Sequence, residues 1–96
     1  MHYLETQYDA RKSFYKKAYI ETQKNDFEQT KDLYSYNTLV ASVSYNFDKN
    51  CKIYNFYGRF SQTTSRHQRE FFKQEGLNDK EIKLVFDSGE LVKEVL

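Results

Sequence analysis

One stretch of this sequence, residues 32–45, reads DLYSYNTLVASVSY and favours a single kind of local structure. From position 39 to position 45, the odd-numbered residues are apolar, and the even-numbered residues between them are mostly small or polar. This period of two is typical of a β-strand with one face buried and one face exposed. Asn37 predicts a bend that divides the stretch into two shorter strands.

Neighbouring segments extend the predicted sheet. Residues 46–50 are polar enough for a hairpin loop, and residues 52–57, KIYNFY, are again typical of a strand. Such short connections predict an antiparallel meander. Residues 13–22 fit a helical stripe as well as a strand, but their Phe, Tyr, Ile and Thr content favours a strand.

The clearest helix covers residues 63–75 and follows a cluster of small polar residues. The residues that can cap its first turn are Thr63, Thr64 and Ser65. Ser65 and Gln68 also have the spacing of a capping box.

The far end of this helix carries a stop signal. Gly76 can adopt the left-handed conformation that closes a helix. Phe71 and Phe72 are the expected core anchors of the buried face. Arg66 and Glu70 are four residues apart, so we expect them to pair on the helix surface.

The two ends of the chain are less regular. Residues 2–12 predict one or two helical turns. Near the C-terminus, residues 81–87 and 90–95 favour a hairpin closed by the tripeptide Asp-Ser-Gly. The alternative is a second helix, because Asn78 and Glu81 have capping-box spacing.

Bulk composition limits the class of protein. The chain has 96 residues with 39% hydrophobic content, which predicts one domain, residues 1–96. Its nine tyrosines and eight phenylalanines allow a small aromatic core. A single cysteine, no long apolar run and no signal-peptide pattern predict a soluble cytoplasmic protein with no membrane partner. We therefore expect an α+β fold, in which an antiparallel, tyrosine-rich sheet of about three to five strands packs on one main helix.

Positive charge is concentrated in the middle of the chain, where residues 49–73 hold six basic side chains and one acidic. Basic side chains interleaved with aromatic ones can contact phosphates and stack on bases, and a helix N-terminus can bind an anion. An ordinary solvated surface and helix capping are the simpler interpretations. The candidate binding residues are Tyr54, Tyr57, Arg59, Thr63, Thr64, Arg66, His67, Arg69 and Lys73.

No catalytic or metal-binding signature is present in the sequence. Cys51 and His67 lack the orienting group that a nucleophile–base pair needs, and His67 has no further ligands at metal-binding spacing. We expect His67 to pack against Phe71 or to hydrogen-bond the sheet. The sequence thus predicts a protein that is not an enzyme and needs no cofactor.

Three segments together are similar to an uncharacterised family of small proteins carried by phages, plasmids and genomes of Gram-positive bacteria. They are SFYKKAYI at 13–20, LYSYNTLVASV at 33–43 and SQTTSRHQREFFKQEGL at 61–77, of which the TTSRH core is the most specific. Gln68 departs from the family pattern, which usually has an apolar residue there. The resemblance supports a strand at 13–22 and implies an origin in a mobile genetic element.

Two functions follow as hypotheses. The first is a non-catalytic, protein-binding inhibitor of a host or defence protein, such as a bacterial defence nuclease, of the anti-CRISPR kind. The alternative is a small nucleic-acid-binding protein that uses the basic face of the helix at 63–75.

Overall fold

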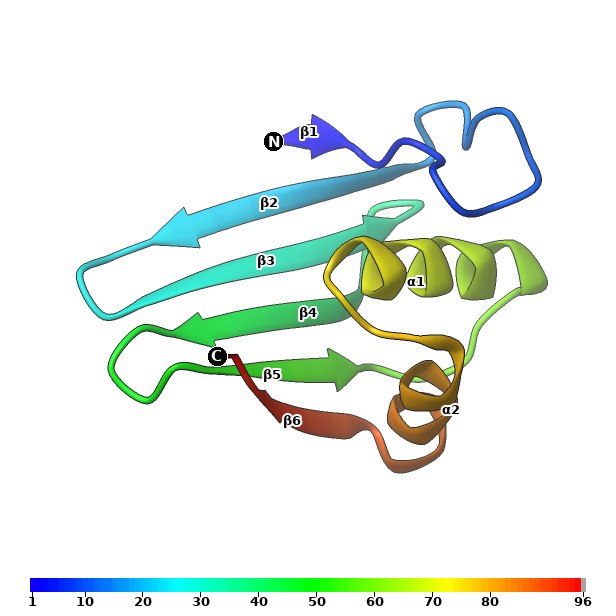
Figure 1. Ribbon diagram of the computed structural model, residues 1–96. Helices are drawn as coiled ribbons and strands as arrows, with labels where there is room; N and C mark the ends of the chain where they lie inside the picture. The colour runs from blue at the N-terminus through cyan, green and yellow to red at the C-terminus, as the bar shows by residue number, and fades with distance from the viewer. Residues whose placement is uncertain (96) are drawn as a thin grey trace.

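A computed structural model describes residues 1–95 of the chain as one sheet covered by two helices (Figure 1). The sheet has six strands in chain order, all antiparallel. The fold class and the meander are confirmed, but the strand count exceeds the predicted three to five. The elements are β1 (His2–Tyr3), β2 (Ala18–Lys24), β3 (Glu28–Ser35), β4 (Thr38–Asn46), β5 (Cys51–Phe56), α1 (Gln62–Gln74), α2 (Asp79–Ser88) and β6 (Glu90–Glu94).

The predicted bend at Asn37 is a tight turn between β3 and β4. Tyr36 and Asn37 both have positive φ, at 50° and 66°, which is the two-residue geometry that fits the twist of a hairpin. The register shifts between Leu33 and Tyr34, where Leu33 opposes Ala41 and Tyr34 opposes Leu39. Val40 is the extra residue of this β-bulge.

Helix α1 confirms the predicted helix and corrects its start. The N-cap is Ser61, whose Oγ accepts from the backbone N–H of Thr64 at 3.0 Å, so the predicted caps at positions 63–65 lie inside the first turn. At the other end, Gly76 has φ +103°. Its N–H donates to Lys73, while the N–H of Leu77 donates to Phe72, and this pair of bonds is a Schellman motif.

The predicted C-terminal hairpin is wrong, because residues 79–88 form α2. The side chain of Asn78 accepts from the Glu81 N–H, and Glu81 accepts from the Asn78 N–H, so the capping box is complete. Ile82, Val85 and Phe86 are buried at helical spacing. The alternation of apolar residues that favoured a strand over 81–87 does not correspond to burial, because Leu84 is half exposed. The second half of the predicted hairpin is a strand, β6, but it pairs with β5.

The predicted N-terminal helix is also wrong. Residues 4–17 form a loop after the short strand β1, and β2 begins only at Ala18. Side chains of Asp9 and Ser13 accept from backbone N–H groups two residues further on, at Arg11 and Tyr15. Such local bonds compete with helical ones and favour turns. The strand predicted over 13–22 is therefore confirmed only in its second half.

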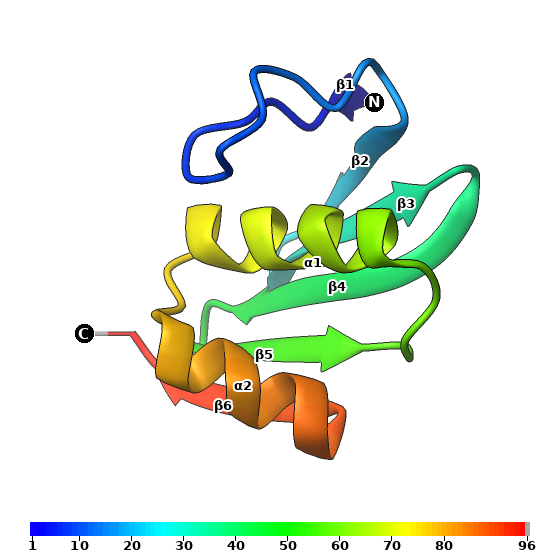
Figure 2. The same ribbon diagram turned by 90° about the vertical axis from the view of Figure 1, so that its right-hand side faces the viewer.

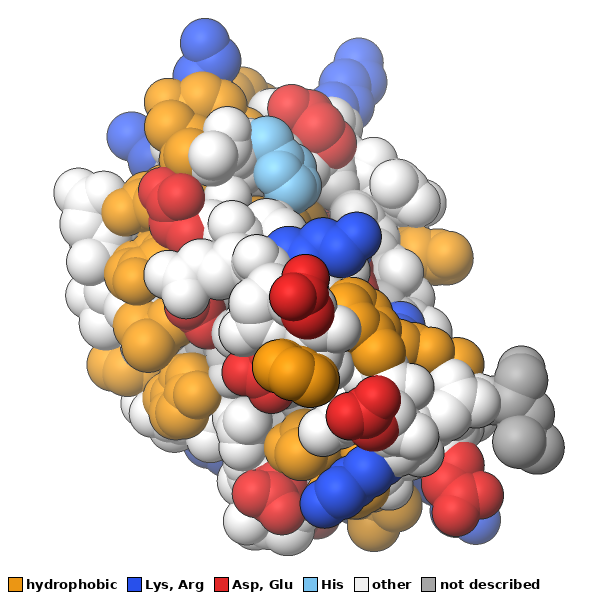
Figure 3. Space-filling model, turned by 90° about the vertical axis from the view of Figure 1, so that its left-hand side faces the viewer, with side chains coloured by type: hydrophobic (Ala, Val, Ile, Leu, Met, Phe, Trp, Pro, Cys, Tyr) orange, Lys and Arg blue, Asp and Glu red, His pale blue; other side chains and the backbone are white. Residues whose placement is uncertain are grey.

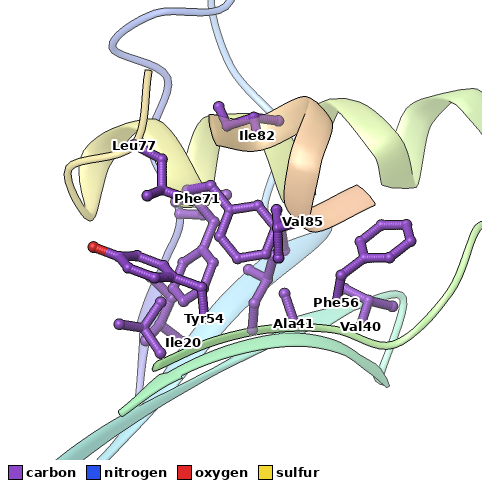
Figure 4. Packing of buried hydrophobic residues seen from close by; sticks show 14 of the residues in the cluster. Ile20, Val40, Ala41, Tyr54, Phe56, Phe71, Leu77, Ile82 and Val85 are labelled. Carbon is purple, nitrogen blue, oxygen red and sulfur yellow. The ribbon is translucent and has the colours of Figure 1, made fainter. Parts of the chain in front are cut away.

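Both helices lie on one side of the sheet (Figure 2). The core between the layers is aromatic: Phe56 and Phe86 stack with ring centroids 4.2 Å apart, and Phe72 packs edge-on to both Tyr54 and Phe86. Figure 4 shows this packing, with side chains of both helices pointing at those of the strands. Burying each such ring contributes about 2 kcal/mol or more, which lets a short chain with a modest apolar content hold together.

Candidate functional site

The face of the sheet turned away from the helices is acidic. Side chains alternate along each strand, so the register places five carboxylates on this open face. They are Glu21, Glu28, Asp32, Glu90 and Glu94. Lysines of the same strands point to the helix side: Lys31 pairs with Glu75 at 3.0 Å, and Lys93 with Glu81 at 3.1 Å. Among the described strand residues, none of the open-face side chains is Lys or Arg.

Two of these carboxylates oppose each other directly. Glu21 and Asp32 are cross-strand partners between β2 and β3. Like charges at such positions destabilise a sheet. Partial burial raises the pKa of Asp32 from its usual value near 3.8. The α-amino group of Met1 lies 3.7 Å from Glu21 and offsets part of the repulsion between Glu21 and Asp32.

Apolar and aromatic groups accompany the acidic ones on the open face. Tyr19 and Tyr34 stack across β2 and β3, with centroids 5.1 Å apart and planes at 9°. Leu39 and Val92 leave 38% and 55% of their surface exposed. In Figure 3, hydrophobic side chains run down the left margin, with acidic ones between them. This mixture of charge and exposed aromatic surface is suited to protein recognition.

The basic residues predicted to bind nucleic acid are brought to one side of the molecule but are largely paired. Arg66 contacts Asp9 at 3.2 Å, and Lys73 contacts Asp79 at 3.0 Å. Arg59 lies 3.7 Å from Asp87, and Arg69 stacks over the ring of Phe86. These carboxylates, two of which are far from their partners in the sequence, reduce the positive potential of this helix face.

The remaining predicted residues divide between core and surface. Tyr54 is buried, and its hydroxyl donates to the carbonyl of Glu75 at 2.7 Å. Burial, together with the charges of Glu75 and Glu81, raises the pKa of Tyr54 to about 12. Thr63 is half-buried on α1. Tyr57 is about half exposed and hydrogen-bonds Ser42 at 2.9 Å, which makes it the predicted aromatic residue that remains on the surface.

His67 lies in the core, as part of a hydrogen-bonded chain. Its Nδ1 contacts the Ser35 hydroxyl at 2.8 Å, and that hydroxyl contacts Thr64 Oγ1 at 2.9 Å. The prediction that His67 bonds the sheet is confirmed, although its packing partner is Phe14, at 4.5 Å between centroids. Burial lowers the pKa of His67 to about 4, against a smaller opposite effect of Asp9, so the ring is neutral near pH 7.

Gln68 is also buried, although the family pattern usually has an apolar residue at this position. Its Nε2 donates to the backbone carbonyls of Val40, at 3.0 Å, and Gly58, at 3.1 Å. Val40 is the bulge residue of β4. The Val40 carbonyl also accepts from the Tyr57 N–H at 3.1 Å, so the amide adds a second bond there and supplies the Gly58 carbonyl with a donor that an apolar side chain would lack.

Glu70 makes structural contacts that the sequence did not indicate. Its Oε1 accepts from the backbone N–H groups of Gln7, Tyr8 and Asp9 at 3.1, 2.8 and 2.8 Å. The predicted surface pair between Arg66 and Glu70 is wrong, because this carboxylate faces the N-terminal loop instead. The open-face carboxylates were missed too, although the alternation within each strand was a signal that could have grouped them.

Within residues 1–95, no helix is long and apolar enough to cross a membrane. The same residues contain no group of three or more His, Cys, Asp or Glu side chains that could hold a metal ion.

Fold and surface together define a small α+β protein with one covered and one open sheet face. The chain belongs to a family of unknown function, DUF8033, which matches residues 3–88. Comparisons with curated proteins and with solved structures give no match.

Proposed function

We propose that this chain is a non-catalytic binding protein that docks onto a positively charged protein surface through its open sheet face. The observation that supports the proposal is the segregation of charge across the sheet. Five carboxylates lie on the open face, whereas the strand lysines lie on the helix side. A face of one sign attracts and orients a partner of the opposite sign, and the exposed apolar groups supply contact area.

The partner class we propose is a bacterial defence nuclease, which the chain would inhibit in the cytoplasm in the manner of an anti-CRISPR. Nucleases hold the phosphate backbone in basic grooves, and an acidic face can occupy such a groove. The resemblance of residues 13–77 to proteins of mobile genetic elements supports an origin in which blocking host defence is useful.

The alternative, nucleic-acid binding through the helix at 63–75, has weaker support. Arg66 and Lys73 are both neutralised by carboxylates, which a bound phosphate would have to displace. Replacing Arg66, Arg69 and Lys73 by alanine is therefore expected to change any affinity for DNA or RNA, and its salt dependence, only slightly. A uniform loss of affinity across sequences with a flatter salt slope would favour the alternative.

Neutralising the opposed carboxylates should raise the stability of the fold and at the same time weaken partner binding. The double variant Glu21→Gln/Asp32→Asn removes a repulsive cross-strand pair, so we expect unfolding to require about 0.5 kcal/mol more, measured by urea denaturation. The same variant should bind the partner more weakly. A matched control, Asp79→Asn/Asp87→Asn, removes two charges from α2 and should leave partner binding unchanged.

The decisive experiment is a pull-down from host lysate after nuclease digestion of all nucleic acid, followed by a cleavage assay with the recovered protein. We expect a nuclease to be retained by the natural chain and by the α2 control, to be inhibited by both, and to be lost with the open-face variant. Retention by the open-face variant, or loss of the partner on digestion, would contradict the proposal.

A further inference from the structure

A second surface of opposite charge lies where the N-terminal loop meets the start of α1. A cavity of about 170 Å³ opens there. The side chains that line it include Arg11, Tyr15, Lys17, Tyr36, Arg66 and His67. The sequence divides these residues among three distant segments, and only folding brings them together.

The charge around this cavity is positive. The loop at residues 11–17 carries four basic side chains and no acidic one. Asp9 is the carboxylate close by, and it pairs with Arg66 at 3.2 Å, so the unpaired positive charge at the cavity comes from the loop. Arg11 and Lys17 are exposed. The cavity therefore favours an anion.

Two exposed tyrosines border the same cavity, and both have unusual backbone geometry. Tyr15 and Tyr36 have φ of 53° and 50°, with 73% and 53% of their surface exposed. Non-glycine residues rarely adopt this conformation, and it persists where the surrounding structure or a function requires it. An asparagine or glycine would fit the turn at position 36 with less strain. Exposed tyrosine rings here can stack on a planar ring.

Behind the cavity wall is a buried polar atom without a partner, Nε2 of His67. Ser61 donates to Thr64 Oγ1 at 3.2 Å, and the hydroxyls of Thr64 and Ser35 link this bond to Nδ1. The Ser35–Nδ1 bond can run in either direction, so Nε2 is an unpartnered donor in one ring tautomer and an unpartnered acceptor in the other. A buried ring nitrogen without a hydrogen-bond partner is unfavourable in either tautomer, and it lies on a residue that lines the cavity.

We propose that this cavity binds a phosphate ester that carries a planar base, such as a nucleotide. Arg11 and Lys17 hold the phosphate, and Tyr15 and Tyr36 stack on the base at the rim. The inference does not rest on the proposed function, because the cavity is lined by none of the open-face carboxylates.

The test is an NMR titration of the full chain with AMP, inorganic phosphate, adenosine and a short oligothymidylate. We expect AMP to shift the signals of Tyr15, Tyr36 and the His67 ring nitrogens, and to bind more tightly than phosphate or adenosine alone. Competition between the oligothymidylate and AMP shows whether the phosphate ester can also come from a single strand. Arg11→Ala/Lys17→Ala should weaken AMP binding about tenfold or more, whereas the control Lys80→Ala/Lys83→Ala on α2 should not.

A second variant tests whether a loss of AMP binding could result from misfolding. Tyr36→Gly removes the ring and relieves the backbone strain, so it should bind AMP more weakly while unfolding at a higher temperature. Absence of AMP binding at millimolar concentration, or affinity unchanged in the Arg11→Ala/Lys17→Ala variant, would overturn the proposal.

Discussion

Replacing Glu70 by alanine is expected to lower the free energy of unfolding by about 3 kcal/mol. The Glu70 carboxylate is 2% exposed and accepts three backbone N–H groups from the loop after β1. Gln74 donates to its other oxygen at 2.8 Å. Removing the carboxylate leaves these donors without an acceptor, and a charged acceptor is worth more than a neutral one.

The loss should be localised first in the N-terminal loop. Hydrogen exchange at the amides of Gln7, Tyr8 and Asp9 should accelerate more than exchange in β3 and β4. Glu70→Gln serves as the matched control: its amide oxygen can still accept, but its NH₂ group would face the Gln74 donor, so we expect a smaller loss. Equal stability of Glu70→Ala and the natural chain would show that this loop is held by other contacts, such as burial of Leu4 and Phe14.

Acidification from pH 7 to pH 4 is expected to destabilise the fold through His67 by about 3 kcal/mol. The folded-state pKa is lowered from 6.5 to about 4, mainly because burial disfavours the charged ring. The unfolded chain therefore takes up a proton near pH 6.5, while the folded chain resists protonation until about pH 4. The stabilising contribution of the neutral ring is complete above pH 6.5, falls between these values and is absent below them.

Chemical denaturation at a series of pH values measures this effect. His67→Phe keeps an aromatic ring beside Phe14 but cannot titrate, so its stability should change much less between pH 6.5 and pH 4.5. The hydrogen bond to Ser35 is lost in this variant, which lowers its free energy of unfolding at every pH. The change in this free energy with pH can still be compared between the two proteins. Parallel pH profiles for the two proteins would contradict the assignment of a neutral buried His67. Glu81, whose pKa is lowered chiefly by its hydrogen bond to the Asn78 backbone, adds a loss that begins at more acidic pH in both proteins.

The sequence predicted correctly those elements whose capping residues, hydrophobic period and turn residues lie within a few positions of one another. Helix α1 has a polar N-terminal cluster, paired phenylalanines and a terminal glycine, and it formed almost where expected. The meander from β3 to β5 followed from period-two alternation and short polar turns. The predictions that failed did so where two local patterns competed. The segment from Ile82 to Phe86 alternates like a strand, but the Asn78–Glu81 capping box and burial of Val85 favoured a helix.

The candidate sites were less predictable than the fold, because they depend on contacts between distant residues. The basic residues of α1 were correctly placed on one side of the helix. The electrostatic effect of Arg66 was not predictable, because its partner Asp9 is 57 residues away and reaches it only after folding. Similarly, nothing near Glu70 in the sequence indicates that its carboxylate would bind the backbone of residues 7–9.

By itself, the sequence determined an α+β class, an antiparallel meander and a capped, amphipathic helix, since hydrophobic period and capping chemistry act over short distances. Only the tertiary structure decided which face of the sheet the helices cover. That choice turns the strand lysines toward the helices and leaves Glu21, Asp32 and their neighbours on the open face. It also brings the loop at 11–17 next to Tyr36 and His67. Charge and ligand-binding geometry at these surfaces arise from the packing of strands and helices against one another, which no single segment encodes.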